Sequence, residues 1–278
     1  MSVEVPFRCI GHTVEVPVSL VPGETTPFVL DTGIGLELVR PEPARRGGAK
    51  PSIETFSGHR MSGQEVRGRM VTLPRLEFGG VDRSEVDAGL LEMDLPPAFE
   101  RIGGFLSLRH FLSTPFTIDF PRERVVVGSD RSEASGAGRA RVPLRLLREG
   151  PALSVFLPMM LPTGTIATME IDSGSDALIL HRRFLGELGL GPEDPRVRRV
   201  AGTDETGHPF ERFFARVNGA VRVRDAPTIL QESPEVMFQE IIYDGLVGAE
   251  FLRRYAVGFD LRTPSITFSP PDLRSPPT

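Results

Sequence analysis

The chain has 278 residues, enough for one large domain or two small ones, and its 40% hydrophobic and 25% charged residues are typical of a globular protein rather than a disordered one. A net charge of -5 leaves no positive excess to bind nucleic acid, and no apolar run approaches the roughly 18 residues of a membrane span. The single cysteine, Cys9, excludes an intrachain disulfide and a cysteine-based metal cage. The 29 glycines and 26 prolines favour turns, so they divide the chain into short elements and indicate an all-β protein.

Short runs with alternating or continuous apolar residues predict strands throughout the chain. In the first half they lie at 13–20, 26–30, 66–73, 116–120 and 124–127. In the second half they lie at 153–159, 165–171, 213–223 and 265–268. Helical periodicity is scarce, and it predicts three brief helices, at 106–112, 178–188 and 249–255.

A polar stretch of small residues at 129–140 lacks apolar periodicity and predicts a flexible linker between two lobes, at 1–128 and 141–268. The last ten residues, 269–278, contain four prolines and are expected to form an extended or disordered tail. Nothing near Met1 combines a basic region with an apolar one, as a signal peptide does. We therefore expect a cytoplasmic protein, or a periplasmic or secreted one if a signal peptide has been removed.

The two halves contain an internal repeat, which is the most informative feature of the sequence. Residues 28–33, Phe-Val-Leu-Asp-Thr-Gly, are matched by residues 169–174, Met-Glu-Ile-Asp-Ser-Gly. A second apolar segment follows in each half, and it reaches Ser107 and Gly248 at the same distance of 76 residues from the aspartate. One Asp-Ser/Thr-Gly triplet is an ordinary turn sequence. Two copies with matching downstream segments indicate a duplicated unit.

These motifs resemble those of the aspartic proteases, the superfamily of the pepsins and the retroviral-type proteases, in a single-chain, bacterial-type form. The resemblance covers most of the chain and rests on Asp31-Thr32-Gly33, Asp172-Ser173-Gly174 and Leu246-Val247-Gly248. It implies two β-barrel-like lobes related by a pseudo-twofold axis, with few short helices, as in the acid protease fold. It also implies that Asp31 and Asp172 are the catalytic pair.

The chemistry of a paired-aspartate site supports this assignment independently. Peptide hydrolysis needs a base that takes a proton from water and an acid that protonates the intermediate and the leaving nitrogen. Two carboxyl groups about 3 Å apart cannot both ionise at low cost, so the pair retains one proton and supplies both functions. Such a pair requires neither a metal nor a cofactor, and we expect none.

The residues that follow each aspartate are expected to support it. Gly33 and Gly174 allow a sharp turn that brings backbone N–H groups to the carboxylates. By resemblance, Thr32 and Ser173 form hydrogen bonds across the twofold axis, whereas simple turn capping is the alternative.

Three positions depart from the family pattern or extend it. Ile34 stands where pepsins usually have a serine that supports the aspartate. Ser107 replaces the glycine expected in the first lobe, where a small residue can still pack; the alternative is a displaced aspartate loop. By resemblance to the retroviral type, Asp176 binds the substrate backbone; the alternative is a solvated charge at the start of a helix.

Proteases of this family close a β-hairpin flap over the substrate. The candidate flaps are 54–63 and 202–209, which share a similar Ser/Thr-Gly-His sequence. Ordinary hairpin turns are the alternative. Neither candidate contains a tyrosine like that of the pepsin flap, because the only tyrosines are Tyr243 and Tyr255. Together with Asp176, the expected substrate-binding residues are Gly35, Ser57, Gly58, His59, Thr206, Gly207 and His208.

The sequence as a whole predicts a monomeric aspartic endopeptidase that acts on peptides or proteins. The five histidines occur in no arrangement typical of a metal site or a serine triad. The alternative, from a different functional class, is a non-catalytic protein of the same fold that binds peptides or inhibits other proteins.

Overall fold

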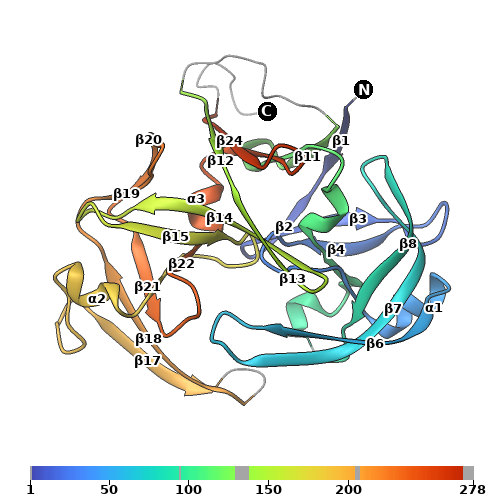
Figure 1. The fold of residues 1–278 in the computed structure, drawn as a ribbon, viewed down its shortest axis with the longest axis horizontal. Helices are drawn as coiled ribbons and strands as arrows, with labels where there is room; N and C mark the ends of the chain where they lie inside the picture. The colour runs from blue at the N-terminus through green and yellow to red at the C-terminus, as the bar shows by residue number, and fades with distance from the viewer. Residues whose placement is uncertain (1, 94, 129–137, 204–206, 272–278) are drawn as a thin grey trace.

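The computed structural model describes residues 2–93, 95–128, 138–203 and 207–271. The described chain forms two β lobes beneath a shared six-stranded sheet, which lies at the top of Figure 1 together with the N-terminus. This sheet has the order β1-β11-β10-β23-β24-β12. Three strands come from each half: β1 (Val3–Pro6), β10 (Phe116–Asp119) and β11 (Arg124–Val127), then β12 (Ala140–Pro143), β23 (Ala256–Asp260) and β24 (Ser265–Ser269). The order is the same from either edge, as a twofold axis between β10 and β23 requires.

The first lobe is an eight-stranded sheet of order β2-β3-β4-β9-β5-β8-β7-β6. Its strands are β2 (Arg8–Ile10), β3 (Thr13–Val18), β4 (Thr26–Leu30), β5 (Leu38–Val39), β6 (Lys50–His59), β7 (Glu65–Phe78), β8 (Val81–Leu90) and β9 (Gly104–Leu106). Its helical elements are α1 (Pro41–Arg46) and three 3₁₀ helices, η1 (Pro97–Phe99), η2 (Leu108–Phe111) and η3 (Phe120–Arg122). None of the described helices, in either lobe, is long and apolar enough to cross a membrane.

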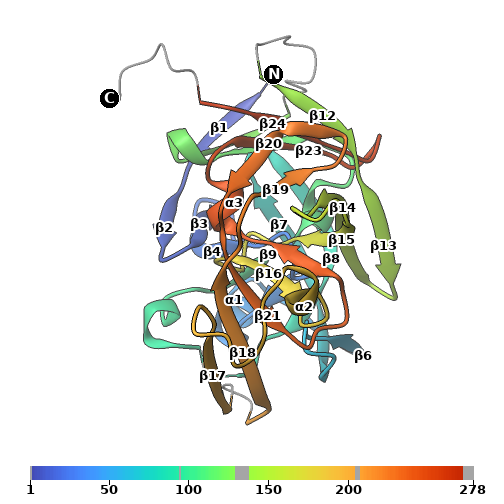
Figure 2. The ribbon, with the colours of Figure 1, turned by 90° about the vertical axis from the view of Figure 1, so that its left-hand side faces the viewer.

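The second lobe repeats this plan in a ten-stranded sheet, with the main order β17-β18-β21-β16-β22-β15-β14-β19-β20 and β13 paired to β14. Its elements are β13 (Arg145–Glu149), β14 (Ala152–Met160), β15 (Ile166–Ile171), β16 (Leu178–His181), α2 (Phe184–Glu187), β17 (Arg198–Thr203), β18 (Pro209–Arg216), β19 (Ala220–Val223), β20 (Ala226–Glu232), β21 (Glu235–Gln239), β22 (Gly245–Val247) and α3 (Ala249–Leu252). Figure 2 shows β17 and β18 at the end of this lobe opposite the shared sheet.

The 76-residue spacing found in the sequence corresponds to one strand pairing in each lobe. In the first lobe β4 pairs in parallel with β9, so that Leu30 lies opposite Leu106. In the second lobe β15 pairs in parallel with β22, so that Ile171 lies opposite Val247. Each aspartate follows directly after such a pair, at the carboxyl end of its strand.

The hydrophobic core runs continuously through both lobes. At the twofold axis the Phe116 ring stacks on Phe111 of its own lobe, with centroids 3.9 Å apart, and on Phe259 of the other lobe, at 5.1 Å. All three rings are buried, so the interface between the halves is part of the core. The expected all-β, two-lobed architecture is thus confirmed.

Several predicted elements differ from those observed. The helix expected at 178–188 is wrong: Leu178, Ile179 and Leu180 are buried in strand β16, between β21 and β22, and only the four-residue helix α2 follows. Burial on both faces of a strand gives an apolar run that resembles a helix in sequence. The helices expected at 106–112 and 249–255 shorten to η2 and α3. The strand expected at 213–223 divides into β18 and β19, where Gly219 has a φ of +96°.

Parts of the expected linker and tail belong to the shared sheet. Residues 129–137 and 272–278 lie outside the described residues. Ala140, expected in the linker, is the first residue of β12 and pairs with Phe268 of β24. Ser269, expected in the tail, is the last residue of β24.

Candidate active site

The two aspartates occupy loops that meet at the twofold axis. The Asp31 N–H donates to the Leu106 carbonyl at 3.0 Å, and the Asp172 N–H donates to the Val247 carbonyl at 3.1 Å. Each carboxyl group lies against the glycine of the opposite loop: a Cβ on Gly33 would stand 2.6 Å from Asp172 Cγ, and a Cβ on Gly174 would overlap the Asp31 carboxyl. Glycine is therefore the residue that lets both carboxyl groups approach the axis.

The two loops are locked to each other by four hydrogen bonds. The Thr32 hydroxyl donates to the Ile171 carbonyl at 2.8 Å and accepts from the Ser173 N–H at 3.0 Å. The Ser173 hydroxyl donates to the Leu30 carbonyl at 3.2 Å and accepts from the Thr32 N–H at 3.1 Å. Both side chains are buried beneath the aspartates. The hydroxyls thus bond across the lobes rather than capping their own turns.

The two carboxyl groups receive equivalent hydrogen bonds from the residue two positions after each aspartate, but the residues three positions after them differ. The Gly33 N–H donates to Asp31 Oδ1 at 2.9 Å, and the Gly174 N–H donates to Asp172 Oδ1 at 2.8 Å. The Ser175 hydroxyl adds a 2.6 Å bond to Asp172 Oδ2. Ile34, at the equivalent position in the first lobe, has no hydroxyl to offer Asp31.

Burial and mutual repulsion favour a shared proton. The pKa of Asp31 lies well above its usual range, first because the carboxyl is desolvated and second because the Asp172 charge is adjacent. The N–H groups of Gly33 and Gly174 oppose this pKa shift but do not reverse it. The two carboxyl groups are close enough to share a hydrogen bond. A pair in this arrangement carries one proton over a wide pH range.

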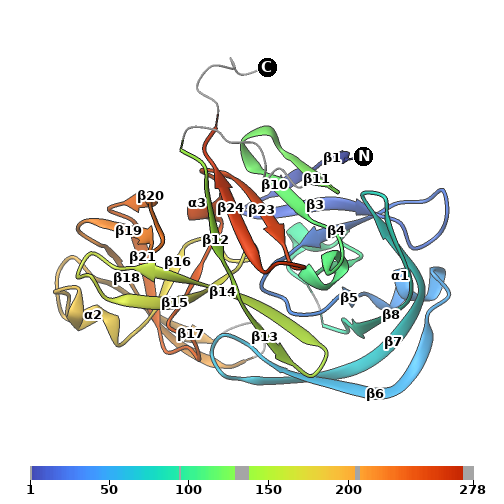
Figure 3. The ribbon, with the colours of Figure 1, turned by 45° about the horizontal axis from the view of Figure 1, so that its top comes forward.

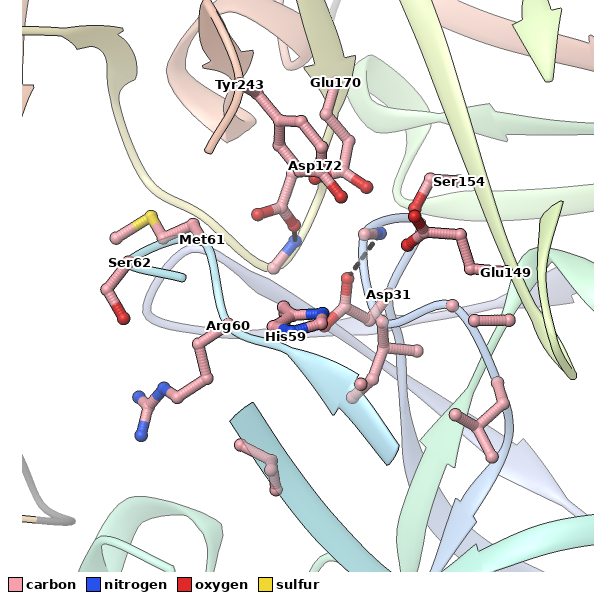
Figure 4. Close-up of a pocket in the computed structure, with 18 of the residues that line it drawn as sticks. Asp31, His59, Arg60, Met61, Ser62, Glu149, Ser154, Glu170, Asp172 and Tyr243 are labelled. Atoms are coloured by element: carbon pink, nitrogen blue, oxygen red, sulfur yellow. Dashed lines mark hydrogen bonds between the residues drawn. The ribbon is translucent and has the colours of Figure 1, made fainter. Parts of the chain in front are cut away.

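The aspartates lie in a cavity of about 770 Å³ between the lobes, shown in Figure 4. Its boundaries are the two aspartate loops, the β6–β7 hairpin of the first lobe, and the β13–β14 hairpin and the start of β18 in the second lobe. Figure 3 shows the β6–β7 hairpin extending from the first lobe beneath β13 toward the second. This volume is within the usual range for ligand-binding pockets.

The tip of the β6–β7 hairpin contacts the second lobe. The Ile242 N–H donates to the Met61 carbonyl at 2.9 Å. The Met61 side chain packs against a small apolar cluster of the second lobe, formed by Ile179, Met237, Ile241 and Leu246. The hairpin therefore spans the cavity and touches both lobes.

Each aspartate loop is also held by a hairpin from the opposite lobe. His12, in the turn between β2 and β3, donates from Nε2 to the Gly174 carbonyl at 2.8 Å. Leu153, in β14, donates its N–H to the Gly35 carbonyl at 2.9 Å. These contacts fix the loops from both sides of the axis.

The structure brings most of the expected substrate-binding residues to the cavity. Gly35, Ser57, Gly58, His59 and His208 line it. Asp176 is exposed and Gly207 is exposed, and neither lines the cavity; Thr206 lies outside the described residues. Strand β16, rather than a helix, follows Asp176.

The two Ser/Thr-Gly-His sequences occupy different places in their hairpins. Ser57, Gly58 and His59 lie in strand β6, and the turn comes later, where the Gly63 N–H donates to the Arg60 carbonyl. His208 directly precedes β18. The similarity of the two sequences therefore does not reflect equivalent positions.

Of the two alternatives for Ser107, the structure shows the packing of a small residue without displacement of the Asp31 loop. The hydrogen bond from Asp31 to Leu106 matches that from Asp172 to Val247 in length. The buried Ser107 hydroxyl accepts from the Arg109 N–H at 3.1 Å and so caps η2. It also lies near buried Glu37, whose pKa is raised by burial and lowered in part by Arg109 and this hydroxyl. Serine at this position stabilises a local polar cluster.

Sequence reasoning missed a polar group beside the aspartates, formed by Glu149, Ser154, Glu170 and Tyr243. Glu170 is only 5% exposed, and burial with the nearby Asp172 charge raises its pKa to about 8. Burial and then Glu170 raise the pKa of Tyr243 to about 12. Glu170 could have been noticed, because it precedes Asp172 by two residues and side chains two apart share one face of a strand.

Comparison with known proteins supports the fold. No protein-family model matches the sequence, and no curated protein matches it either. The crystal structure of basic 7S globulin from soybean superimposes with a TM-score of 0.56 at 12% sequence identity, covering 96% of this chain and 94% of that chain. The chain has the pepsin-like two-lobed fold. At this identity the similarity concerns the fold alone.

Proposed function

We propose that the protein is an aspartic endopeptidase that hydrolyses peptide bonds with the Asp31/Asp172 pair. The observation that supports this most strongly is the pair itself: two carboxyl groups close enough to share a hydrogen bond, on loops locked by Thr32 and Ser173. The pair lies on a cavity large enough for several residues of a peptide.

The asymmetry of the hydrogen bonds assigns the roles of the two carboxyl groups. Ser175 donates a hydrogen bond to Asp172, whereas the raised pKa of Asp31 favours the protonated form of Asp31. Asp172 accepts a proton from the attacking water, and Asp31 donates its proton to the carbonyl oxygen of the scissile bond. Asp172 then gives its proton to the nitrogen, the C–N bond breaks to release the amine, and a hydroxyl of the intermediate returns its proton to Asp31 as the carboxylic acid product forms.

The surrounding hairpins are suited to an extended peptide. The β6–β7 hairpin and the start of β18 line the same cavity as the aspartate loops and provide backbone and side chains for contact with a peptide. Closing such a site excludes water from the reacting groups and strengthens their electrostatic interactions. We expect denatured proteins and flexible peptides to be the substrates.

A second candidate is a non-catalytic protein that binds peptides in the same cavity. Ile34 favours it, because Asp31 lacks the hydroxyl support that Asp172 receives from Ser175. The locked loops and the raised pKa of Asp31 favour the enzyme. Both candidates predict peptide binding, and only the enzyme predicts cleavage.

The test is cleavage of a denatured protein by the wild type, Asp31→Asn and Asp172→Asn. Each substitution removes one member of an acid–base pair, so we expect kcat to fall by about a thousandfold or more. Asp225→Asn, at an exposed turn far from the cavity, is the matched control and should retain wild-type activity. Circular dichroism should show that all variants fold.

Undiminished cleavage by either active-site variant would overturn the proposal. Calorimetry with a statine-type peptide separates the two candidates further. Stoichiometric binding without any cleavage by the wild type would identify the non-catalytic alternative.

A further inference from the structure

Glu170 is the feature of the cavity that the proposed chemistry does not use. It lies on β15 two residues before Asp172, so the two side chains lie on the same face of the strand. Figure 4 shows both entering the cavity, with Tyr243 beside them. The equivalent residue of the first lobe, two before Asp31, is the fully buried Val29. A glutamate at this position is therefore not required by the strand.

The charged groups that act most strongly on Glu170 are acidic. Asp172 directly follows the strand of Glu170, Asp31 is on the loop of the other lobe, and Glu149 ends β13, which pairs with β14 on the side away from β15. Of these acids, Asp172 has the largest effect in raising the pKa of Glu170 after burial itself. The Ser154 hydroxyl, on β14, hydrogen-bonds to the Glu170 carboxyl, and the charges with the largest effects on its pKa are those of Asp172, Asp31 and Glu149. A buried carboxyl without a cationic partner is poorly stabilised when charged.

Aromatic rings adjoin this carboxyl. The phenol of Tyr243 lies close enough for the Glu170 charge to raise its pKa, and it also hydrogen-bonds to Ser154. The Tyr243 ring packs edge-on against Phe156, with centroids 4.9 Å apart. Aromatic surface beside carboxyl groups suits a side chain with an apolar stem and a positive end.

The arginines of the cavity wall, Arg60 and Arg212, belong to the β6–β7 hairpin and to β18. Arg212 donates from Nε to Gln239 at 2.9 Å and lies over the Phe210 ring, 4.1 Å from its centroid. Arg60 points away from Glu170 in Figure 4. The Glu170 side of the cavity is thus acidic.

We propose that Glu170, assisted by Glu149, forms an acidic subsite beside Asp172 that binds the lysine or arginine side chain of a peptide. The inference rests on the proposed function, since it names the substrates that the same cavity selects. The positive end of the bound side chain pairs with the Glu170 carboxylate, and its stem lies along Tyr243. An acidic side chain at that place is repelled, which adds to the selectivity.

Binding of the cation is coupled to loss of a proton. The free carboxyl, with a pKa of about 8, is mostly protonated at neutral pH. Pairing with a lysine ammonium favours the ionised form, so the carboxyl releases its proton to the buffer as the peptide binds. A neutral side chain of the same shape causes no such release.

The test uses binding rather than cleavage, so that it stands apart from the test of catalysis. Statine-type peptides that carry lysine or its uncharged counterpart norleucine, at one position at a time on either side of the statine, are titrated by calorimetry. We expect lysine to bind about tenfold more tightly or better at one position. Titration in two buffers of different ionisation enthalpy should show proton release for that lysine peptide alone.

Glu170→Gln keeps the shape of the side chain and should remove both the preference and the proton release. Glu193→Gln, on an exposed loop, is the matched control and should keep both. Glu170→Asp retains the charge and should restore part of the preference. Equal binding of lysine and norleucine at every position by the wild type overturns the subsite, as does failure of all the peptides to bind.

The outcomes separate this inference from the proposed function. A lysine preference in binding without cleavage of any peptide retains the subsite and rejects the enzyme. Cleavage at equal kcat/KM for lysine and norleucine peptides retains the enzyme and rejects the subsite.

Discussion

The two aspartate loops share one backbone plan and differ in the side chains around it. Each aspartate follows a parallel strand pair, donates its N–H to the partner strand and accepts a hydrogen bond from the N–H two residues later. Only Asp172 receives a further bond, from Ser175, because Ile34 occupies the equivalent place beside Asp31. The duplicated backbone thus sets where the carboxyl groups lie, and the unequal neighbours give the two carboxyl groups different hydrogen-bond partners.

A second difference concerns the helix that follows the downstream apolar segment. In the second lobe the N–H groups of Ala249 and Glu250 donate to the carbonyls of Ser175 and Asp176, at 2.8 and 2.7 Å. That approach leaves no room for a side chain at Gly248. In the first lobe the Ser107 hydroxyl caps η2 instead. One lobe therefore uses backbone contact where the other uses a side chain.

The largest expected effect follows from this second difference. A Cβ at Gly248 would overlap the Ala177 carbonyl and stand 2.8 Å from that of Asp176, and both obstacles are backbone. We expect Gly248→Ala to lower the free energy of unfolding by about 3 kcal/mol. Ser107→Ala, which removes a cap without a clash, should cost about 1 kcal/mol. Urea denaturation measures both, and equal losses would contradict the distinction between the lobes.

Glu170 and its counterpart Val29 provide the next test. The pKa of about 8 in the folded state exceeds the ordinary value of 4.5, so between these pH values the folded protein retains a proton that the unfolded chain has lost. The stabilising contribution is complete below about pH 4.5 and disappears as the pH rises through about 8. The free energy of unfolding of the wild type should therefore fall as the pH rises through this range. We expect this fall to be a few kcal/mol smaller in Glu170→Val.

Urea denaturation at acidic and alkaline pH measures this difference. Glu193→Gln should follow the wild type, because Glu193 is exposed. A pH dependence of Glu170→Val parallel to that of the wild type would show that Glu170 titrates normally.

The hydroxyl lock between the loops should be symmetric. Thr32→Val and Ser173→Ala each remove one donor and one acceptor from the four buried hydrogen bonds. We expect each to cost about 2 kcal/mol, with Thr32→Ser nearly neutral as the conservative control. Thermal and urea unfolding of the three variants measures these changes in stability. If only one of Thr32→Val and Ser173→Ala is destabilised, the hydroxyl of one loop alone holds the two loops together.

The smallest effects concern the unequal support of the two carboxyl groups. Ser175→Ala removes the bond to Asp172 and should lower kcat about tenfold. Ile34→Ser offers Asp31 the missing hydroxyl, which should lower the raised pKa of Asp31. Because the proton is then lost at lower pH, the alkaline limb of the kcat/KM profile should move toward lower pH. Ile34→Val, which adds no donor, should leave the profile unchanged.

Much of the fold could be predicted because the spacing of the internal repeat equals the separation of two paired strands. The apolar segment and the aspartate lie 76 residues apart in both halves, and the pairings of β4 with β9 and β15 with β22 have that separation. The meeting of the two Asp-Ser/Thr-Gly loops followed from the same pattern. Strand β16 could not be predicted, since burial on both faces makes its sequence resemble a helix.

The surroundings of the aspartates were harder to predict, because they depend on residues brought from elsewhere in the chain. Ser107 is explained by Glu37 and Arg109, whose proximity is set by folding rather than by sequence spacing. Tyr243 lies beside Asp172 only because the loop before β22 folds against it. Glu170 is different, since the period of two along β15 already placed it on the same face as Asp172.

The contact of the β6–β7 hairpin with the second lobe has a kinetic consequence. The lobes are joined by a continuous core and by the pairing of β10 with β23, so they separate only if the core is disrupted. The hairpin tip reaches the second lobe through contacts that include the hydrogen bond at the Met61 carbonyl and the packing of the Met61 side chain. We expect the hairpin to open and close over the cavity while the paired carboxyl groups stay assembled beneath it.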